Sequence, residues 1–478
     1  MLNLLLIIGT LYVLALVYLT WIARDNDRSS ANYLMAGSNV GSFLGLFTFA
    51  ATLFSTFTIL GMPDFFRVHG VGAWIFIAVS DMFMVFGILM VGYYVRRKIK
   101  ESNTSYYGMA GFMQHCYRSR TAGIVVFLGA FLFLIPYVAI QIKGVVLFLD
   151  QAFPNKLPIW LWASLMLIIM VIYSELGGLK AIMYSDVLQG ILLLLVIWVI
   201  GIVCLNRLGG VSQMFEQVHR VDESLLSVPG PKGLFDFQFL LGSLIGIVMI
   251  PFTQPQVSTR LVIMKSHHAL YRTAVALGFF AILVILPTLF IGMYGAVHYE
   301  NDSTADFLGK TLITDQLPLI GVLVLLGLIA AAMSTADSQI FGLGAEIRSL
   351  LKGEDHHALR STRGAILIFA VICLVFSLFS PDELVLLARL SFTGTALLAP
   401  MIFLGIFSKD AARWSWMPWL TMLAILLFIL SSFNIIPNKL GQIRTDLILL
   451  ISLGGIAVIA GYGSGSRRVS GKSQGANF

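Results

Sequence analysis

Long apolar runs recur from one end of this 478-residue chain to the other. A helix of about 17 to 25 apolar residues crosses a hydrocarbon core of about 30 Å, and the runs have that length. Only 12% of the residues are charged, whereas ordinary soluble domains carry roughly 25%. The pattern excludes a soluble enzyme and predicts an all-α, polytopic membrane protein without enzymatic activity.

Hydropathy predicts about thirteen transmembrane helices. Their expected ranges are 2–22, 43–66, 72–94, 121–149, 157–175, 180–204, 237–257, 271–297, 317–346, 364–380, 383–407, 416–433 and 446–463. With the N-terminus outside and the C-terminus inside, most of the 31 lysines and arginines, Arg260 among them, fall in cytoplasmic turns, as the positive-inside rule requires. Because these charges are divided among short turns, they do not form the basic face that nucleic-acid binding needs.

Two predicted spans contain interruptions that a simple membrane anchor does not need. The second span carries five hydroxyl side chains ahead of a break at Gly61-x-Pro63, and the seventh contains Pro251 and Pro255. Unwound backbone is tolerated at membrane depth only where it is buried in protein or lines a water-filled cavity. Two such breaks, five spans apart, indicate a midplane substrate site in a five-plus-five inverted repeat. Taken singly, each break is explained equally well by helix packing and kinking.

The ninth predicted span carries polar side chains that suit a cation. Ser334, Asp337 and Ser338 share one helical face, and Thr335 adds a second hydroxyl beside Ser334. Hydroxyls and freed carbonyls can replace the hydration shell of a monovalent cation, and a carboxylate at membrane depth is by default functional. Hydroxyls that bond to carbonyls of their own helix are the alternative, which leaves Asp337 unexplained.

The sixth predicted span brings a second carboxylate into the membrane. It opens at Gly177-Gly178, a pair that permits a tight inner turn. Asp186 lies eight residues beyond Gly178, about 12 Å farther along if the segment is helical.

Four motifs together resemble the sodium:solute symporter family, which includes sodium/proline, sodium/sugar, sodium/pantothenate and sodium/sialic acid carriers. The motifs are Gly177-Gly178-Leu179-x-Ala181, Ser185-Asp186-x-x-Gln189, Gln254-Pro255 with Arg260, and Ala331-x-Met333-Ser334-Thr335-x-Asp337-Ser338. The resemblance runs from about Leu4 to Gly461 and implies a LeuT-like fold. The implied organisation is an extra N-terminal helix with a cytoplasmic turn (1–42), a first five-helix repeat (43–204), an extracellular loop (205–236), a second five-helix repeat (237–407), two C-terminal helices (408–463) and a cytoplasmic tail (464–478).

The resemblance also implies three sets of binding residues. A sodium site is implied at the carbonyls of Ala51, Phe54 and Ala331 and the hydroxyls of Ser334 and Thr335. A second sodium or a proton is implied at Asp186, Asp337 and Ser338, where Asp337 replaces a hydroxyl present in the sialic acid carriers. Substrate contacts are expected from Ser55, Thr56, Thr58, Gln141, Gln254 and Arg389. Two roles stay open for Arg389, which either binds a substrate carboxylate or extends to the outer surface.

These residues lead us to expect an electrogenic, sodium-coupled secondary active symporter that imports a small organic solute. A carboxylate, an amino acid or a sugar acid is favoured, while Leu53 and Ile247 replace residues of the proline carriers and disfavour proline. Proton coupling through Asp186 and Asp337 and a transporter-like solute sensor are the alternatives. Sodium is the expected ion. We expect a multi-pass protein of the cytoplasmic (inner) membrane, in contact with the lipid bilayer and functional as a monomer.

Overall fold

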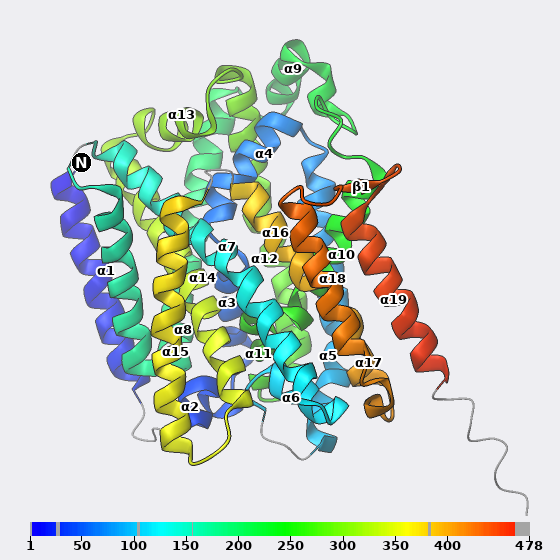
Figure 1. Cartoon of the computed structure of the whole chain (residues 1–478). Coiled ribbons are helices and arrows are strands. Elements are labelled where there is room, and N and C mark those ends of the chain that lie inside the picture. Colours follow the sequence, from blue (N-terminus) through cyan, green and yellow to red (C-terminus); the bar gives the residue numbers. More distant parts are fainter. Residues whose placement is uncertain (1, 25–28, 103–105, 155, 381–383, 464–478) are drawn as a thin grey trace, which may run out of the picture.

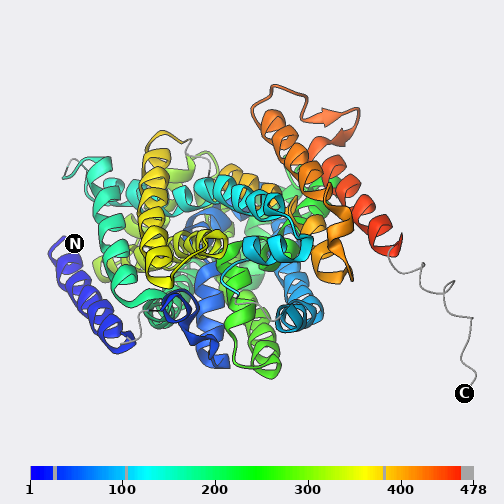
Figure 2. The same ribbon diagram turned by 60° about the horizontal axis from the view of Figure 1, so that its bottom comes forward.

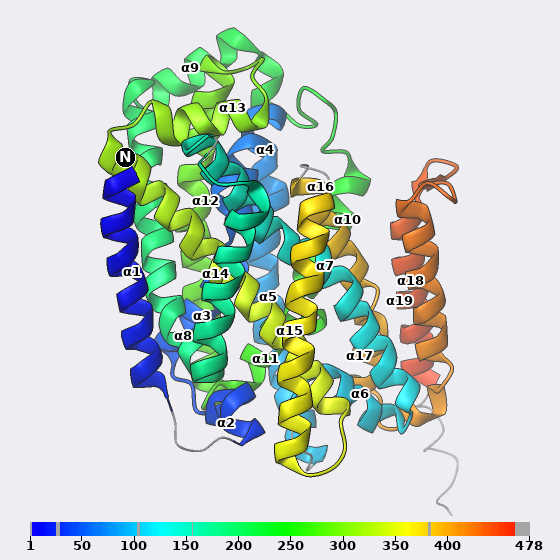
Figure 3. The same ribbon diagram turned by 60° about the vertical axis from the view of Figure 1, so that its left-hand side comes forward.

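The computed structural model describes residues 2–24, 29–102, 106–154, 156–380 and 384–463, so the predicted cytoplasmic tail 464–478 lies outside the described residues. Long helices form a bundle around α14 (Pro318–Leu350), which packs against α7, α8, α11 and α15 (Figure 1). α1 lies on one flank of the bundle, and α18 and α19 lie on the opposite flank (Figure 3). In the first view, the short helices α9 and α13 cover the top of the bundle, and α2 and α6 lie at its base.

The helices of the first half of the chain lie between Leu2 and Leu226. They are α1 (Leu2–Ala23), α2 (Ser30–Met35), η1 (Ala36–Ser38), α3 (Ser42–Leu53), η2 (Phe57–Gly61), α4 (Met62–His69), η3 (Ile75–Val79), α5 (Ser80–Ser102), α6 (Met109–Tyr117), α7 (Arg120–Ala152), α8 (Ile159–Arg207), α9 (Val211–Val221) and η4 (Glu223–Leu226).

The second half adds further helices and one short hairpin. They are α10 (Phe237–Thr253), α11 (Pro255–Ile263), α12 (His267–His298), α13 (Thr304–Gly309), η5 (Lys310–Thr314), α14 (Pro318–Leu350), α15 (Asp355–Phe379), α16 (Leu384–Ala396), α17 (Ala399–Phe407), η6 (Ala411–Trp414), α18 (Met417–Ser432), β1 (Lys439–Leu440), β2 (Ile443–Arg444) and α19 (Thr445–Gly463). Figure 2 shows the bundle after its base has been turned forward.

Two spans are broken, and they are the two that the sequence predicts. α3 and the pair η2 and α4 meet at 59°, and α10 and α11 meet at 55°. The first break lies at Phe54, where the backbone is extended, and so it comes earlier than the predicted Gly61-x-Pro63. Pro63 instead stands at the second position of α4, directly after the π-helical turn η2, with which α4 is continuous.

The seventh predicted span ends too early at residue 257. After the break at Gln254, α11 continues to Ile263 and buries every residue from Pro255 to Leu261. Arg260, which was expected in a cytoplasmic turn, is only 1% exposed. The prediction was wrong because α11 contains several polar residues and falls below a hydropathy threshold although it is enclosed by protein.

Among the described residues, eight helices are long and apolar enough to cross a membrane, and the number is ten if each bent pair is one span. The 49-residue α8 covers two predicted spans and bends at Gly178, which has φ +61°. α18 and α19 are shorter apolar helices. The predicted loop 205–236 contains α9 and η4, and the predicted turn before residue 42 contains the largely buried α2.

The bend in α8 predicts a strict requirement for glycine at position 178. A Cβ there would lie 2.7 Å from the Tyr33 carbonyl oxygen, and its φ and ψ belong to a region that costs other residues about 1–3 kcal/mol. We expect Gly178→Ala to lower the melting temperature of the purified protein clearly. Gly364→Ala is the matched control, because a Cβ at Gly364 meets nothing within 4 Å. Equal melting temperatures for both variants would contradict the constraint.

Candidate functional site

Two hydroxyls of α14 converge on one carbonyl at the break of the second span. Ser334 Oγ lies 3.1 Å and Thr335 Oγ1 lies 2.9 Å from the Ala51 carbonyl oxygen, and each donates a hydrogen bond to it. Ser334 Oγ also lies 3.0 Å from the carbonyl oxygen of Ala331. Four of the five predicted sodium ligands are therefore brought together, and the fifth, Phe54, stands at the break itself.

These oxygens are available because α3 ends here. The last carbonyls of a helix have no partner inside that helix, and α3 ends at Leu53, two residues after Ala51. Ser334 also bonds back to its own helix, as the alternative explanation of its hydroxyl expected. Its second contact, with Ala51, is one that back-bonding inside α14 does not explain.

Asp186 lies in a fully buried cluster that joins four helices. Its Oδ2 accepts a hydrogen bond of 2.6 Å from Thr48 of α3 and lies 3.8 Å from Arg260 Nη2 of α11. Arg260 also donates to Ser338 of α14 at 2.7 Å and to Thr48 at 3.3 Å. Because Asp186 belongs to α8, the cluster ties α8, α3, α11 and α14 together.

The second buried carboxylate, Asp337 of α14, has a partner of its own. Asp337 accepts a hydrogen bond from the hydroxyl of Tyr173 on α8. Tyr12 of α1 accepts one of 2.9 Å from Gln189, three residues after Asp186. Within the described residues, Asp186 Oδ1 and Asp337 Oδ1 are buried without a hydrogen-bond partner. Each carboxylate thus keeps one buried oxygen that can accept a further bond.

Most of the predicted substrate residues near the first break bond to its unwound backbone. Thr58 Oγ1 accepts from the Ser55 amide at 3.0 Å, and Ser55 Oγ accepts from the Phe57 amide at 3.1 Å. Gln141 Oε1 of α7 accepts from the Thr56 amide at 3.1 Å. The Thr56 hydroxyl itself is buried without a partner in the described part of the chain. Thr56 is therefore the candidate of this group with an unsatisfied polar side-chain atom.

The second break has its own set of amide side chains. Gln254, which stands at the break, donates to Thr395 Oγ1 at 3.4 Å and accepts from Gln256 at 2.6 Å. Gln256 Oε1 and the hydroxyl of Ser391 are buried without partners among the described atoms. Both breaks therefore combine satisfied backbone with polar side-chain atoms that lack a protein partner.

Arg389 does not join the other substrate candidates. It lies 3.6 Å from Asp446 of α19, and its guanidinium stands over the Phe239 ring. It also lines a cavity of about 1140 Å³ together with Asp64 and Lys232. This cavity is bordered by α4, α7 and α16 and reaches the start of α13 at Thr304. Arg389 thus lies in the wall of this cavity and already has a carboxylate partner, Asp446, from its own chain.

Sequence reasoning missed three partners of the two buried carboxylates. Arg260 was assigned to a turn, and neither Thr48 nor Tyr173 was linked to a carboxylate. One signal for Arg260 was present in the sequence: Pro255 is a favoured first residue of a helix, and Val257 and Leu261 are spaced four apart, which predicts that a helix continues past the break. No local pattern predicts the pairing of Tyr173 with Asp337, because the two residues are 164 positions apart.

Comparison with known proteins decides the family. The model of the sodium:solute symporter family matches residues 33–414. The chain belongs to the sodium:solute symporter family. It is 23% identical to the sodium/proline symporter 2 of Staphylococcus saprophyticus over 91% of both chains. It is 26% identical to the sodium/pantothenate symporter of Haemophilus influenzae, over 50% of this chain and 52% of that protein.

Two solved structures share the fold. A substrate-bound, outward-open Na⁺-coupled sialic acid symporter matches with a TM-score of 0.78 at 16% identity, over 96% of this chain and 98% of the other. Mhp1, a nucleobase-cation-symport-1 family transporter in a closed conformation, matches with a TM-score of 0.58 at 14% identity, over 91% and 94%. This symporter is thus a multi-pass membrane transporter with a LeuT-like fold, and sodium is its coupled ion.

The geometry around Asp186 predicts that Asp186 and Arg260 stabilise the folded protein as a pair. Removing one partner of a buried ion pair costs about 3–5 kcal/mol, because the other charge is left uncompensated. Arg260→Gln should therefore lower the melting temperature strongly. Adding Asp186→Asn to this variant should restore part of the loss. The measurement is thermal denaturation in choline chloride, without sodium. The wild type, Arg260→Gln, Asp186→Asn and the double variant together form the double-mutant cycle. Strictly additive effects would show that the two side chains do not interact.

Proposed function

We propose that this symporter imports a small organic solute together with sodium, as a secondary active carrier that works by alternating access. The observation that carries the proposal is the convergence of Ser334 and Thr335 on the Ala51 carbonyl. Oxygen atoms from a helix break and from hydroxyls are the ligands that a desolvated sodium ion needs. In this proposal sodium binds Ala51, Phe54, Ala331, Ser334 and Thr335.

The proposed site suits coupling because its ligands come from both repeats. Ala51 and Phe54 belong to the first broken span, whereas Ser334 and Thr335 belong to α14. Sodium then favours the arrangement in which these helices are close, and a ligand shifts a conformational equilibrium only through such differential contacts. One charge that crosses 100 mV supplies about 2.3 kcal/mol, which corresponds to roughly a fortyfold concentration ratio.

We propose a second cation place at Asp186, Asp337 and Ser338, occupied by sodium or by a proton. With both carboxylates ionised, two acids and Arg260 leave one surplus negative charge in a buried region. A single monovalent cation neutralises that charge. The buried Oδ1 atoms of the two aspartates support this assignment, because each lacks a partner within the described residues.

We propose that the solute is polar, with a carboxylate, an amino acid or a sugar acid favoured. Ser55, Thr56, Thr58, Gln141 and Gln254 surround the two breaks, and the unpartnered Thr56 hydroxyl supports a hydrogen-bonding ligand. A buried polar atom without a partner costs free energy, which a polar solute relieves. Arg389, on the wall of the outer cavity, is proposed to attract an acidic group.

The proposed topology has thirteen spans, with the N-terminus outside and the C-terminus inside. The count requires two spans from the bent α8 and one each from α18 and α19. At about 1.5 Å per residue, the 49 residues of α8 are more than twice as long as one crossing of about 30 Å requires. The proposed repeats are 43–204 and 237–407, preceded by the helix and turn of 1–42, joined by the outer loop 205–236, and followed by the C-terminal helices of 408–463. We place the protein in the cytoplasmic (inner) membrane as a functional monomer.

The sodium site is tested by removing its two hydroxyls. Ser334→Ala with Thr335→Ala should abolish the rise in melting temperature that sodium chloride produces relative to choline chloride, since ligand binding stabilises only the folded state. Sodium-stimulated uptake should be lost as well. Thr362→Ala, which removes a buried hydroxyl that bonds within α15, should keep both responses.

A full sodium response in the folded double variant would contradict the site. Repeating the sodium titration at about pH 6 and about pH 8 shows whether sodium or a proton occupies the second cation place at Asp186, Asp337 and Ser338. A proton there competes with sodium at the lower pH, whereas a second sodium ion gives a steep sodium dependence at both.

A panel of amino acids, sugars and carboxylates, each tested with and without sodium, identifies the solute by thermal stabilisation. For an acidic solute, Arg389→Gln should raise the apparent dissociation constant at least tenfold, because a charged hydrogen bond contributes about 1.5–3 kcal/mol. Arg444→Gln is the matched control, since Arg444 pairs with the same Asp446. An unchanged constant in Arg389→Gln would remove this residue from the substrate path.

A further inference from the structure

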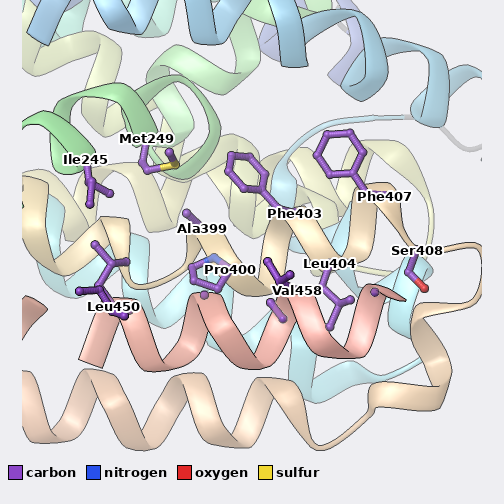
Figure 4. A pocket seen from close by; sticks show the side chains of 14 residues that line it. Ile245, Met249, Ala399, Pro400, Phe403, Leu404, Phe407, Ser408, Leu450 and Val458 are labelled. Carbon is purple, nitrogen blue, oxygen red and sulfur yellow. The ribbon is translucent and has the colours of Figure 1, made fainter. Parts of the chain in front are cut away.

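An apolar groove lies between the second repeat and the last helix. It has a volume of about 520 Å³ and runs between α10, α17 and α19. Met249 of α10, Phe403 of α17 and Val458 of α19 line it (Figure 4). Apart from Ser408, its lining residues have apolar side chains or are glycines. The groove lies among helices of a membrane protein, where the surrounding solvent is hydrocarbon.

The length of the groove matches one half of a bilayer. Its lining on α19 runs from Leu450 to Gly461, a stretch of twelve residues that spans about 16 Å of helix. A hydrocarbon core is about 30 Å thick, so the groove extends through the depth of a single lipid leaflet. This is the dimension of one acyl chain that lies along the helix.

Small residues on α19 leave the space open. Gly454, Ala457 and Gly461 all line the groove. A Cβ at Gly454 or Gly461 would meet nothing within 4 Å. Small residues usually allow helices in membranes to approach closely. Here α19 packs on α17, but its residues at these positions are too small to fill the groove. The side chains of the described residues therefore do not fill the groove.

One end of the groove is basic. Ser408 lines that end, and its carbonyl oxygen accepts a hydrogen bond of 3.0 Å from Lys98 Nζ. The exposed Lys409 follows directly, and Arg413 pairs with Asp410 at 3.4 Å. Lys98, Lys409 and Arg413 outnumber the single acid Asp410. This end of the groove, its basic mouth, therefore carries a net positive charge.

Aromatic residues place this same end at the level of lipid headgroups. Phe407 is half exposed and its ring lies 5.5 Å from that of Tyr94. The Trp414 and Trp416 rings lie 5.8 Å apart in the next turn of chain. Tryptophan and tyrosine are enriched at membrane interfaces. The basic mouth thus lies where a phosphate group of the adjacent leaflet is found.

We propose that the groove between α10, α17 and α19 is a binding site for an anionic phospholipid. One acyl chain lies along α19 against Met249, Phe403 and Val458. The headgroup phosphate lies at the basic mouth, beside Lys98 and Lys409. The lipid fills the space between the second repeat and the helix pair α18 and α19, and it holds α19 against the transport core.

Native mass spectrometry of the detergent-purified protein tests this site without any knowledge of the transported solute. The probes are phosphatidylglycerol and phosphatidylcholine with identical acyl chains. The wild type should retain one phosphatidylglycerol molecule with at least tenfold preference over phosphatidylcholine. Phosphatidylglycerol should also raise its melting temperature. Equal retention of both lipids, or of neither, would overturn the proposal.

Variants locate the bound lipid. Gly454→Leu and Gly461→Leu each place a larger side chain in the groove, at positions where an added Cβ meets nothing within 4 Å, and should lose the retained phosphatidylglycerol. Gly455→Leu is the matched control: its Cβ also meets nothing within 4 Å, yet residue 455 does not line the groove, so retention should be unchanged. Lys98→Gln with Lys409→Gln should bring the preference for phosphatidylglycerol close to one.

Wild-type retention in both groove-filling variants would overturn the proposal, as would an equal loss in Gly455→Leu. A second copy of the protein as the true occupant would also overturn it, and would appear as a dimer that Gly454→Leu dissociates.

Discussion

The pairing of Asp186 with Arg260 is the interaction on which the interior of this symporter depends. Charges are costly to bury unless each finds a partner of opposite sign and hydrogen bonds for its remaining atoms. Thr48 and Ser338 supply hydrogen bonds to the pair. Because the four residues come from α8, α11, α3 and α14, satisfying one ion pair fixes the relative positions of two broken spans, the central helix and the bent helix.

The same requirement explains why the breaks are surrounded by amides and hydroxyls. An unwound segment at membrane depth exposes N–H and carbonyl groups that lipid cannot satisfy. At the first break, Ser55, Thr58 and Gln141 accept hydrogen bonds from the freed amides. The Ala51 carbonyl is bonded by two hydroxyls of a neighbouring helix. The groups that stabilise the break are thus the same groups to which the proposed function assigns the binding of sodium and solute.

Local patterns predicted the parts of this site that lie on one segment. The hydroxyl-rich second span, the two breaks and the face that carries Ser334 and Asp337 are visible as spacing and composition. The pairings across the bundle were not, because contacts such as Thr48 with Asp186 join residues 138 positions apart. Arg260 was placed wrongly since hydropathy measures affinity for lipid, and α11 is enclosed by protein rather than by lipid. The two roles left open for Arg389 did not include an ion pair within the chain, because the sequence does not reveal that Asp446 of α19 lies 3.6 Å away.

The unequal number of charges in the buried cluster bears on the kinetics of a transport cycle. Two carboxylates and one guanidinium leave the empty interior negative when both acids are ionised. In the proposed function, a cation at the two aspartates makes this region neutral and the sodium ion at Ala51 adds one positive charge. A membrane potential that is negative inside would then drive the loaded interior inward and the empty interior outward, so that both halves of the cycle would respond to voltage.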